Sequence, residues 1–324
     1  MRSLTIFFFG LLLIACIDAP KPGTGSDADN TSVRANTSTE HPISFTEPAP
    51  MSEGPEYPGK TIDQLFPIIS DHSFADGNFR EMRFDVEVLG FRVAVSGFAP
   101  QSIKKNSKAL LKYRTRQPAD YWSNLVGVSS LLGPESKQIY VVSTGPGAVC
   151  CTNYWITDVS SKTPRNLFRS EDYGSFRNAM EVFDAEGDGV YELVQFDSCF
   201  RYFMDDCGSC SPEPRAYFRY DAKRQRYRPV KGVQQDFVKK EMERTEKWIE
   251  EKYQELKAKN DLTTEFDLHR TVLSYVADLL HIGEEKKAWR VFNKYGNDAD
   301  GKVRKEIRRR LASCEFYQAL IAKR

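Results

Sequence analysis

The spacing of apolar residues changes once along this chain of 324 residues, and the change limits what the chain can fold into. Between about residues 59 and 232, apolar and polar residues alternate in short runs such as Phe84–Val88, with glycine- or proline-rich turns between the runs. A period of two with frequent turns is typical of antiparallel strands. From 233 to 324, apolar residues recur at every third or fourth position, which is typical of helices that bury one face.

The sequence therefore predicts a segregated α+β protein. We expect an antiparallel all-β domain over 59–232, built like a sandwich or like propeller blades, followed by a small helical-hairpin domain over 233–324. The strand candidates are 84–88, 91–95, 125–130, 138–143, 154–159, 192–197 and 216–220. The last predicted helix has an apolar stripe that consists of Val303, Ile307, Leu311, Cys314 and Leu320.

The first 16 residues carry an export signal. Arg2 is followed by an uncharged run, Ile6–Ile14, which is too short to cross a bilayer as a helix, for which about 20 residues are needed. The run ends in Leu13-Ile14-Ala15-Cys16, which resembles the lipobox of bacterial lipoproteins. This resemblance implies that residues 1–15 are a signal peptide and that Cys16 is acylated and anchors the chain to a membrane of the cell envelope. The alternative is an ordinary signal peptide that is cut after Ala19.

Residues 16–58 have the composition of a disordered tether. They are rich in Pro, Gly, Ser, Thr and acidic residues, and they hold too few apolar side chains to offset the entropy lost on ordering. A flexible segment of about 40 residues spans roughly 35 Å. The whole chain has 46 Lys and Arg residues against 45 Asp and Glu residues, a balance that gives no reason to expect a nucleic-acid partner.

Six cysteines follow Cys16, and five of them lie between residues 150 and 210. In an exported protein this clustering predicts disulfide bonds, although six cysteines allow 15 pairings. The spacing Cys207-Gly208-Ser209-Cys210 also occurs in thiol redox sites and in half of a zinc site. A second CxxC and a helix start are both missing, so we expect structural disulfides. The candidates are Cys150, Cys151, Cys199, Cys207, Cys210 and Cys314.

An acidic loop follows the strand-like segment 180–183. Acidic residues occupy positions one, three, five and nine of the loop, around a glycine that permits a tight turn. The loop resembles the calcium-binding hairpin of FG-GAP and VCBS-type propeller repeats. The resemblance implies that calcium is the cofactor, bound by the side chains of Asp184, Glu186, Asp188 and Glu192 and by the carbonyl of Val190. The alternative is an acidic turn without a metal.

Sequence motifs for hydrolysis are few. GxSxG and HExxH are absent, and the four histidines show no catalytic spacing. We therefore expect a non-catalytic binding or structural module of the cell envelope. The segment Gly283–Ala288 resembles the junction of a tetratricopeptide-type helical hairpin, which implies an alternative function, docking of a protein partner by the helices. An extracytoplasmic hydrolase is a more distant alternative.

Overall fold

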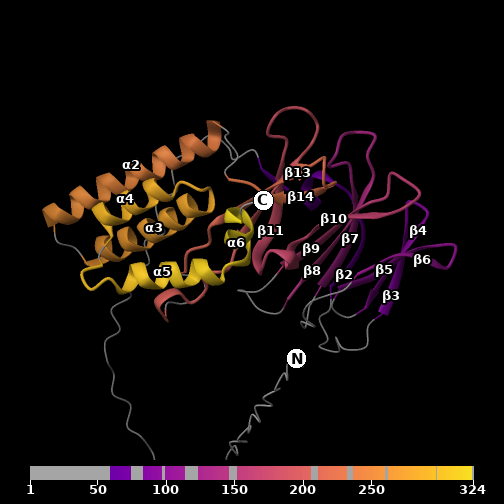
Figure 1. Ribbon diagram of the computed structural model, residues 1–324, viewed down its shortest axis with the longest axis horizontal. Helices are drawn as coiled ribbons and strands as arrows, with labels where there is room; N and C mark the ends of the chain where they lie inside the picture. Colours follow the sequence, from indigo (N-terminus) through magenta and orange to yellow (C-terminus); the bar gives the residue numbers. More distant parts are fainter. Residues whose placement is uncertain are drawn as a thin grey trace, which may run out of the picture. The chain divides into compact units, whose positions relative to one another are not determined.

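Figure 1 shows the computed structural model of the chain. The structure describes residues 59–73, 83–96, 99–113, 123–145, 152–205, 211–231, 236–259, 262–296 and 298–322. These residues belong to one unit of the structure, Glu53–Arg324. The predicted signal peptide, the acylated Cys16 and the tether lie outside the described residues.

Three antiparallel sheets form the β region, and we name them A, B and C. The first has the strand order β1 (Lys60–Thr61), β11 (Phe176–Phe183), β12 (Glu192–Asp197), β13 (Arg215–Asp221) and β14 (Arg226–Pro229). Sheet B has the order β10 (Arg165–Arg169), β9 (Thr152–Asp158), β8 (Gln138–Thr144), β7 (Ser123–Ser129) and β2 (Ile68–Ser73). Sheet C is a meander of β3 (Arg83–Val88), β4 (Phe91–Ser96), β5 (Ala99–Lys105) and β6 (Lys108–Lys112). A short helix, α1 (Ile62–Leu65), joins β1 to β2.

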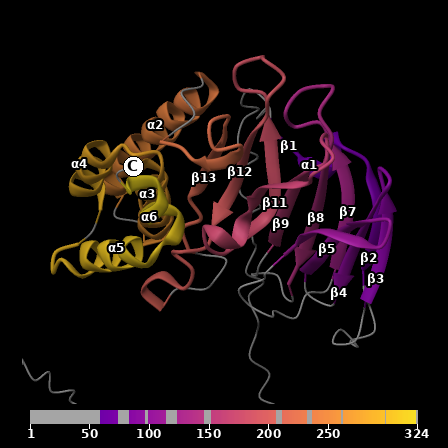
Figure 2. The same ribbon diagram turned by 45° about the vertical axis from the view of Figure 1, so that its right-hand side comes forward.

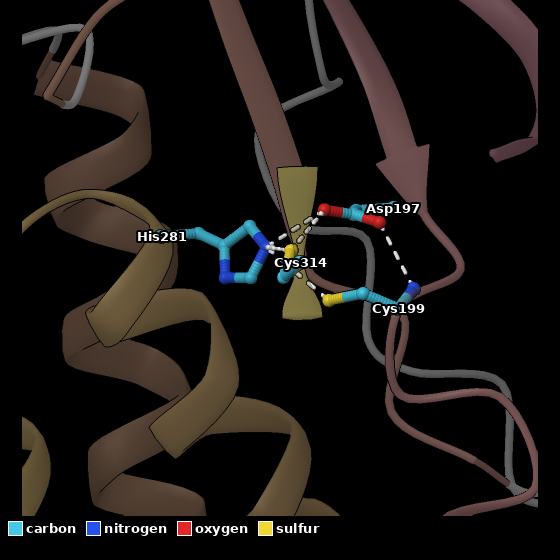
Figure 3. A group of neighbouring side chains, drawn as sticks. All are labelled: Asp197, Cys199, His281 and Cys314. Carbon is cyan, nitrogen blue, oxygen red and sulfur yellow. Dashed lines mark hydrogen bonds and ion pairs between the residues drawn. The ribbon is translucent and has the colours of Figure 1, made fainter. Parts of the chain in front are cut away.

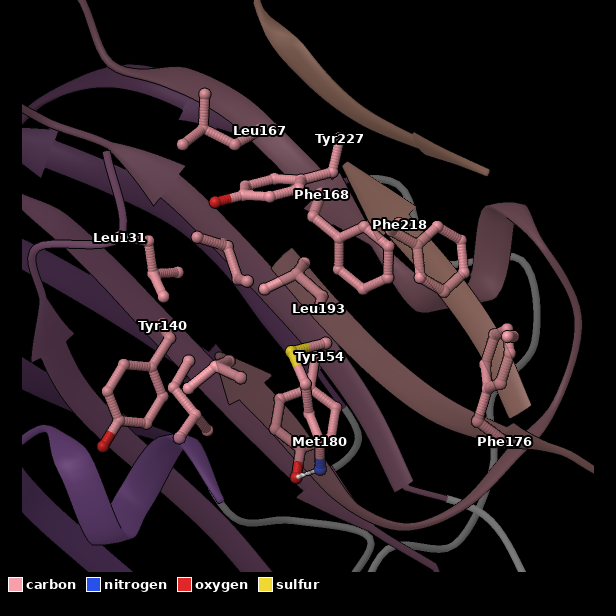
Figure 4. Close-up of a cluster of buried hydrophobic side chains, with 14 of the residues drawn as sticks. Leu131, Tyr140, Tyr154, Leu167, Phe168, Phe176, Met180, Leu193, Phe218 and Tyr227 are labelled. Atoms are coloured by element: carbon pink, nitrogen blue, oxygen red, sulfur yellow. Dashed lines mark hydrogen bonds between the residues drawn. The ribbon is translucent and has the colours of Figure 1, made fainter. Parts of the chain in front are cut away.

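Sheet B is the middle of three layers. Along β8, Ile139 and Val141 pack toward sheet C, whereas Tyr140 and Val142 pack toward sheet A. The second of these interfaces is rich in aromatic rings (Figure 4), and there the backbone N–H of Met180 donates to the hydroxyl of Tyr154 over 2.8 Å. Both faces of β8 and β9 are therefore buried, and these strands have no polar face directed at solvent.

The predicted segregated α+β class is confirmed. The strand predicted at 192–197 coincides with β12, and the one at 216–220 falls within β13. Between β3 and β4, Leu89 and Gly90 both have positive φ, 50° and 73°, as a two-residue hairpin turn requires. The strands that the pattern missed include β5 and β14, where charged residues and proline hide the alternation.

The C-terminal region is helical. Its helices are α2 (Asp236–Lys259), α3 (Leu262–His281), α4 (Glu285–Tyr295), α5 (Lys302–Ser313) and α6 (Glu315–Ile321). In Figure 1 and Figure 2 these helices lie next to sheet A, while sheet C lies on the far side of sheet B. Gly283 links α3 to α4 with a φ of +83°, as expected of a glycine at a helical junction. No helix of the described part is long and apolar enough to span a membrane.

One helix prediction is wrong in an informative way. The stripe from Val303 to Leu320 is divided between two helices, because Cys314 has an extended backbone (φ −77°, ψ 107°) and ends α5 before α6 begins. The aromatic core of sheets A and B takes in Phe316 and Leu320 of α6, whereas Ile307 and Leu311 of α5 belong to the helical core. Because of this break, the first part of the apolar stripe packs in the helical core and the second part packs in the core of sheets A and B.

The segment that follows β12 also connects the two cores, because it leaves sheet A and enters the helical core. Phe200 and Phe203 are buried among the side chains of α3, α4 and α5. Tyr202 and Met204 alternate with them, are about half exposed, and have positive φ values of 54° and 53°. Such backbone strain persists only where surrounding contacts fix the chain. This segment lies directly beside the group of side chains described next.

Candidate metal centre

Four metal-ligating side chains meet where sheet A joins the helical region (Figure 3). They are Asp197, Cys199, His281 and Cys314, and their ligand atoms all lie within 4.8 Å of one another. Within the described ranges, this is the one group of three or more His, Cys, Asp or Glu side chains that could hold a metal ion. The four residues come from three segments of the chain, because Asp197 and Cys199 are two positions apart.

Local structure explains why each side chain reaches this point. Asp197 is the last residue of β12, and Cys199 lies two residues later in the segment that enters the helical core. His281 is the last residue of α3, just before the turn at Gly283. Cys314 occupies the break between α5 and α6. Asp197, His281 and Cys314 thus lie at the ends of regular elements, and Cys199 lies in the turn that follows β12.

Four of the distances between ligand atoms are close to those around a tetrahedral ion. His281 Nε2 lies 3.1 Å from Asp197 Oδ2, 3.8 Å from Cys314 Sγ and 3.9 Å from Cys199 Sγ. Cys314 Sγ lies 3.0 Å from Asp197 Oδ2. A zinc ion with bonds of about 2.0–2.3 Å in tetrahedral geometry separates its ligand atoms by about 3.3–3.8 Å. These four distances are close to that range, whereas the group as a whole spans up to 4.8 Å, so side-chain movements of up to about 1 Å would accommodate the ion.

Two further hydrogen bonds orient the ligands. The Nδ1 of His281 donates to the carbonyl oxygen of Ala277 over 3.1 Å, because a carbonyl can only accept, and this leaves Nε2 directed at the group. The backbone N–H of Cys199 donates to Asp197 Oδ1 over 2.9 Å, which leaves Oδ2 as a single ligand atom. Protein metal sites commonly orient histidine and carboxylate ligands through such outer contacts.

Three of the four residues are buried, and Cys199 is partly exposed. His281 has no exposed surface, and Asp197 and Cys314 are each 2% exposed. The ring of His281 stacks on Phe316, with ring centres 5.3 Å apart and planes 11° apart. Four protein ligands in a largely buried group are typical of structural zinc sites, whereas catalytic zinc sites have three protein ligands and keep a position for water or substrate. Calcium takes six to eight oxygen ligands, so two sulfurs and a nitrogen do not suit it.

Without a metal, the negative charge of Asp197 favours a positive charge within the group. Burial by itself lowers the pKa of His281, but the hydrogen bond and negative charge of Asp197, together with Cys314, raise it to about 10. The hydrogen bond from Cys199 lowers the pKa of Cys314, while burial raises the pKa of the Cys199 thiol. Without a metal, a proton on the imidazole supplies the positive charge that the carboxylate attracts. Metal binding would displace protons from the histidine and the thiols.

Arg310 of α5 connects two of the segments that carry ligands of the candidate metal centre. Its guanidinium donates to the carbonyl oxygens of Arg201 and Tyr202, over 2.7 Å and 3.0 Å. The same guanidinium also donates to Glu306 over 2.8 Å. Arg310 thereby ties the segment that carries Cys199 to the helix that ends at Cys314, and it satisfies carbonyls in a strained stretch of backbone.

The sequence prediction placed a metal elsewhere, at the hairpin between β11 and β12. Asp184 accepts there from the backbone N–H groups of Asp188 (3.1 Å) and Gly189 (2.8 Å), and Asp188 accepts from Val190 (2.9 Å). Arg219 contacts Glu186 at 3.1 Å and Glu192 at 3.0 Å. The hairpin prediction agrees with the structure, but backbone N–H groups of the loop and Arg219 of β13 already contact these carboxylates. Calcium binding at Asp184, Glu186, Asp188, Val190 and Glu192 stays a prediction.

The cysteine predictions divide into two groups. The disulfide prediction is wrong for Cys199 and Cys314, which are free cysteines and belong to the candidate metal centre. Cys150, Cys151, Cys207 and Cys210 lie outside the described residues, so disulfides among them stay a prediction. Sequence reasoning sought zinc only at the CxxC and missed the four ligands, because Asp197 and Cys314 are 117 positions apart. The one local signal was an acidic residue and a cysteine two positions apart at the end of a strand.

Comparisons with known protein families, with curated proteins and with solved structures find no match for this chain.

Proposed function

We propose that this protein is a non-catalytic structural or binding module of the bacterial cell envelope, and that one zinc ion fastens its helical region to its β region. The ligands would be Asp197, Cys199, His281 and Cys314. The observation that carries the proposal is the convergence of these four ligand atoms, which all lie within 4.8 Å of one another at a largely buried point of the fold.

A structural role fits this position better than a catalytic one. Three of the four residues are buried, and each ligand already has a protein contact that orients it. A zinc ion at this point would join the end of β12 to the ends of α3 and α5. Binding energy at a site that exists only in the folded chain is also folding energy. The ion would thus stabilise the packing of the helical core against the β core.

The envelope location is supported by the sequence alone. Arg2, the apolar run Ile6–Ile14 and Cys16 resemble the export and acylation signal of bacterial lipoproteins. Exported proteins meet oxidising surroundings, in which neighbouring thiols tend to form disulfides. A zinc ion would hold Cys199 and Cys314 as thiolate ligands and keep the two sulfurs apart.

Metal content tests the proposal. Protein refolded or purified with zinc and then dialysed should hold one zinc ion per chain, measured by native mass spectrometry. Cys314→Ala should lose the ion. The matched control is Cys207→Ala/Cys210→Ala, which removes the CxxC and should keep it. Cobalt in place of zinc should give the charge-transfer absorption of thiolate coordination in the wild type and in the control.

Two results would contradict the proposal. One is a wild-type protein that retains no metal ion after dialysis. The other is loss of zinc from the Cys207→Ala/Cys210→Ala protein while Cys314→Ala keeps it, which would place the ion at the CxxC.

A further inference from the structure

Helix α5 carries an unusual concentration of positive charge. Its twelve residues include six Lys or Arg and a single acidic residue, Glu306. Helix α2 is twice as long and has seven basic and seven acidic residues, so charge on it is balanced. The near-neutral total of the chain therefore hides a strongly basic segment. In both views α5 lies along one edge of the helical region (Figure 1, Figure 2).

Helix stability does not account for this pattern. The N-terminus of a helix is the positive end of its dipole and favours acidic residues. The first turn of α5 nevertheless has Lys302, Arg304 and Lys305 and no acidic side chain. Asp298 meets the need for a cap by accepting from the backbone N–H groups of Val303 and Arg304. The basic side chains of the first turn therefore lie at the positive end of the helix dipole, where their interaction with the dipole is unfavourable.

Much of this charge faces solvent. Lys302, Lys305, Arg308 and Arg309 are all exposed, while Val303, Ile307 and Leu311 form the buried side of the helix. Within the described residues, Lys305 and Arg308 take part in no ion pair, whereas Lys302 is paired with Asp300 and Arg309 with Glu306. We call the side formed by Lys302, Lys305, Arg308 and Arg309 the basic face of α5.

A tryptophan borders the basic face. The guanidinium groups of Arg304 and Arg308 lie over the ring of Trp289 of α4, 5.5 Å and 5.3 Å from its centre. Trp289 is half-buried. Tryptophan beside Lys and Arg is characteristic of surfaces that rest at the boundary between water and lipid headgroups, where its ring is partly dehydrated.

We propose that the basic face of α5 binds the phosphate headgroups of an anionic membrane surface. The charge of the face complements such a surface, and each Lys or Arg close to it adds to the attraction. The choice of a membrane as the occupant rests on the proposed envelope location. An acyl group at Cys16 and a tether that spans roughly 35 Å would hold α5 within reach of headgroups. Stable membrane attachment commonly combines a lipid with a polybasic patch.

Vesicle binding tests the basic face without the lipid. The protein is the chain from residue 16 onward with Cys16→Ser, so that no acyl group contributes. We expect it to sediment with vesicles that contain phosphatidylglycerol and not with vesicles of phosphatidylcholine alone. Raising the salt concentration should weaken the binding, because exposed charges are screened over about 10 Å at 0.1 M salt.

Two double variants make the same charge reversal near the starts of two different helices. Lys302→Glu/Lys305→Glu changes the first turn of α5, where glutamate suits the helix dipole, so folding should be preserved. Lys239→Glu/Lys240→Glu makes the same charge change at two exposed positions near the start of α2. We expect the α5 variant to bind anionic vesicles at least about tenfold more weakly and the α2 variant to differ less than about twofold. Arg308→Glu is a second α5 variant that should weaken binding in the same direction.

Three outcomes would overturn the inference. The first is no binding of the wild type to anionic vesicles at low salt. The second is equal weakening by the α2 and α5 variants. The third is tighter binding to a single-stranded oligonucleotide than to vesicles, which would make the face a site for a soluble polyanion. None of these outcomes depends on zinc, so the inference and the zinc proposal can fail separately.

Discussion

Replacing Cys314 with alanine should destabilise the protein by an amount that depends on zinc. Cys314 is buried between α5 and α6, and its sulfur lies 3.0 Å from Asp197 Oδ2 and 3.8 Å from His281 Nε2. The substitution removes one heavy atom and one proposed zinc ligand. It adds no heavy atom, and alanine can adopt the extended backbone at this position.

The loss of unfolding free energy has a part that is independent of metal and a part that depends on zinc. Without metal, loss of one buried atom costs about 1 kcal/mol, and loss of a hydrogen bond to a charged group adds about 1.5–3 kcal/mol. With free zinc at a hundredfold excess over its Kd, the wild type gains a further 2.7 kcal/mol or so by mass action. The variant should not gain it. The free-energy difference between the two proteins should therefore be larger with zinc than with a chelator by about 2.7 kcal/mol.

Urea unfolding in a zinc buffer and in a chelator measures both differences. In the wild type, the same gain should appear in thermal unfolding as a rise in Tm of about 5–10 °C. Ile307→Val is a suitable control, because Ile307 is buried in the helical core on α5 but has no ligand atom. It should cost about 0.5–1.5 kcal/mol, and the cost should be the same in both buffers.

The reasoning would be refuted if Cys314→Ala cost the same free energy of unfolding with zinc and with chelator. Such a result would mean that Cys314 acts only by packing and by its hydrogen bond. A wild-type protein whose unfolding midpoint is unaffected by zinc would lead to the same conclusion.

Three other predictions concern separate parts of the chain. Intact mass of membrane-extracted protein should show an acyl increment that Cys16→Ser abolishes; a soluble, unmodified chain beginning after Ala19 would contradict this. Calcium at the β11–β12 hairpin must displace Arg219 from Glu186 and Glu192. Millimolar calcium should therefore raise the Tm more in Arg219→Gln than in the wild type, and a Tm indifferent to calcium and chelator would leave a metal-free turn. Asp158 is 4% exposed, and although burial raises its pKa, hydrogen bonds from Arg165 and Ser160 lower it overall. A carboxyl group with a lowered pKa contributes stability above its unfolded pKa and loses it as pH falls, so Asp158→Asn should flatten the decline in unfolding free energy below about pH 4.

The sequence by itself determined the class of the fold, because alternation and helical spacing are local properties of consecutive residues. The strand 192–197 and the hairpin after Phe183 are examples, since a run of alternating residues and a glycine-permitted turn need no distant partner to be recognised. The sequence also indicated the glycine junction at Gly283 between two helices.

Only the tertiary structure decided where each apolar face went. The period of two predicts one buried face for β8, but the strand lies in the middle layer and buries both. Likewise, Cys314 continues the apolar stripe of a helix in sequence and so is expected within it. The competing cores on either side of Cys314 end that helix instead.

The candidate metal centre belongs wholly to the tertiary level. His281 and Asp197 are 84 positions apart, and Cys314 is a further 33 positions beyond His281. Metal-site motifs in sequence depend on ligands that are close in sequence, whereas these ligands come from three segments that are far apart in the chain. They meet because Phe200 and Phe203 draw the segment after β12 into the helical core while Phe316 draws α6 into the β core. The site therefore exists only after the two cores have packed together.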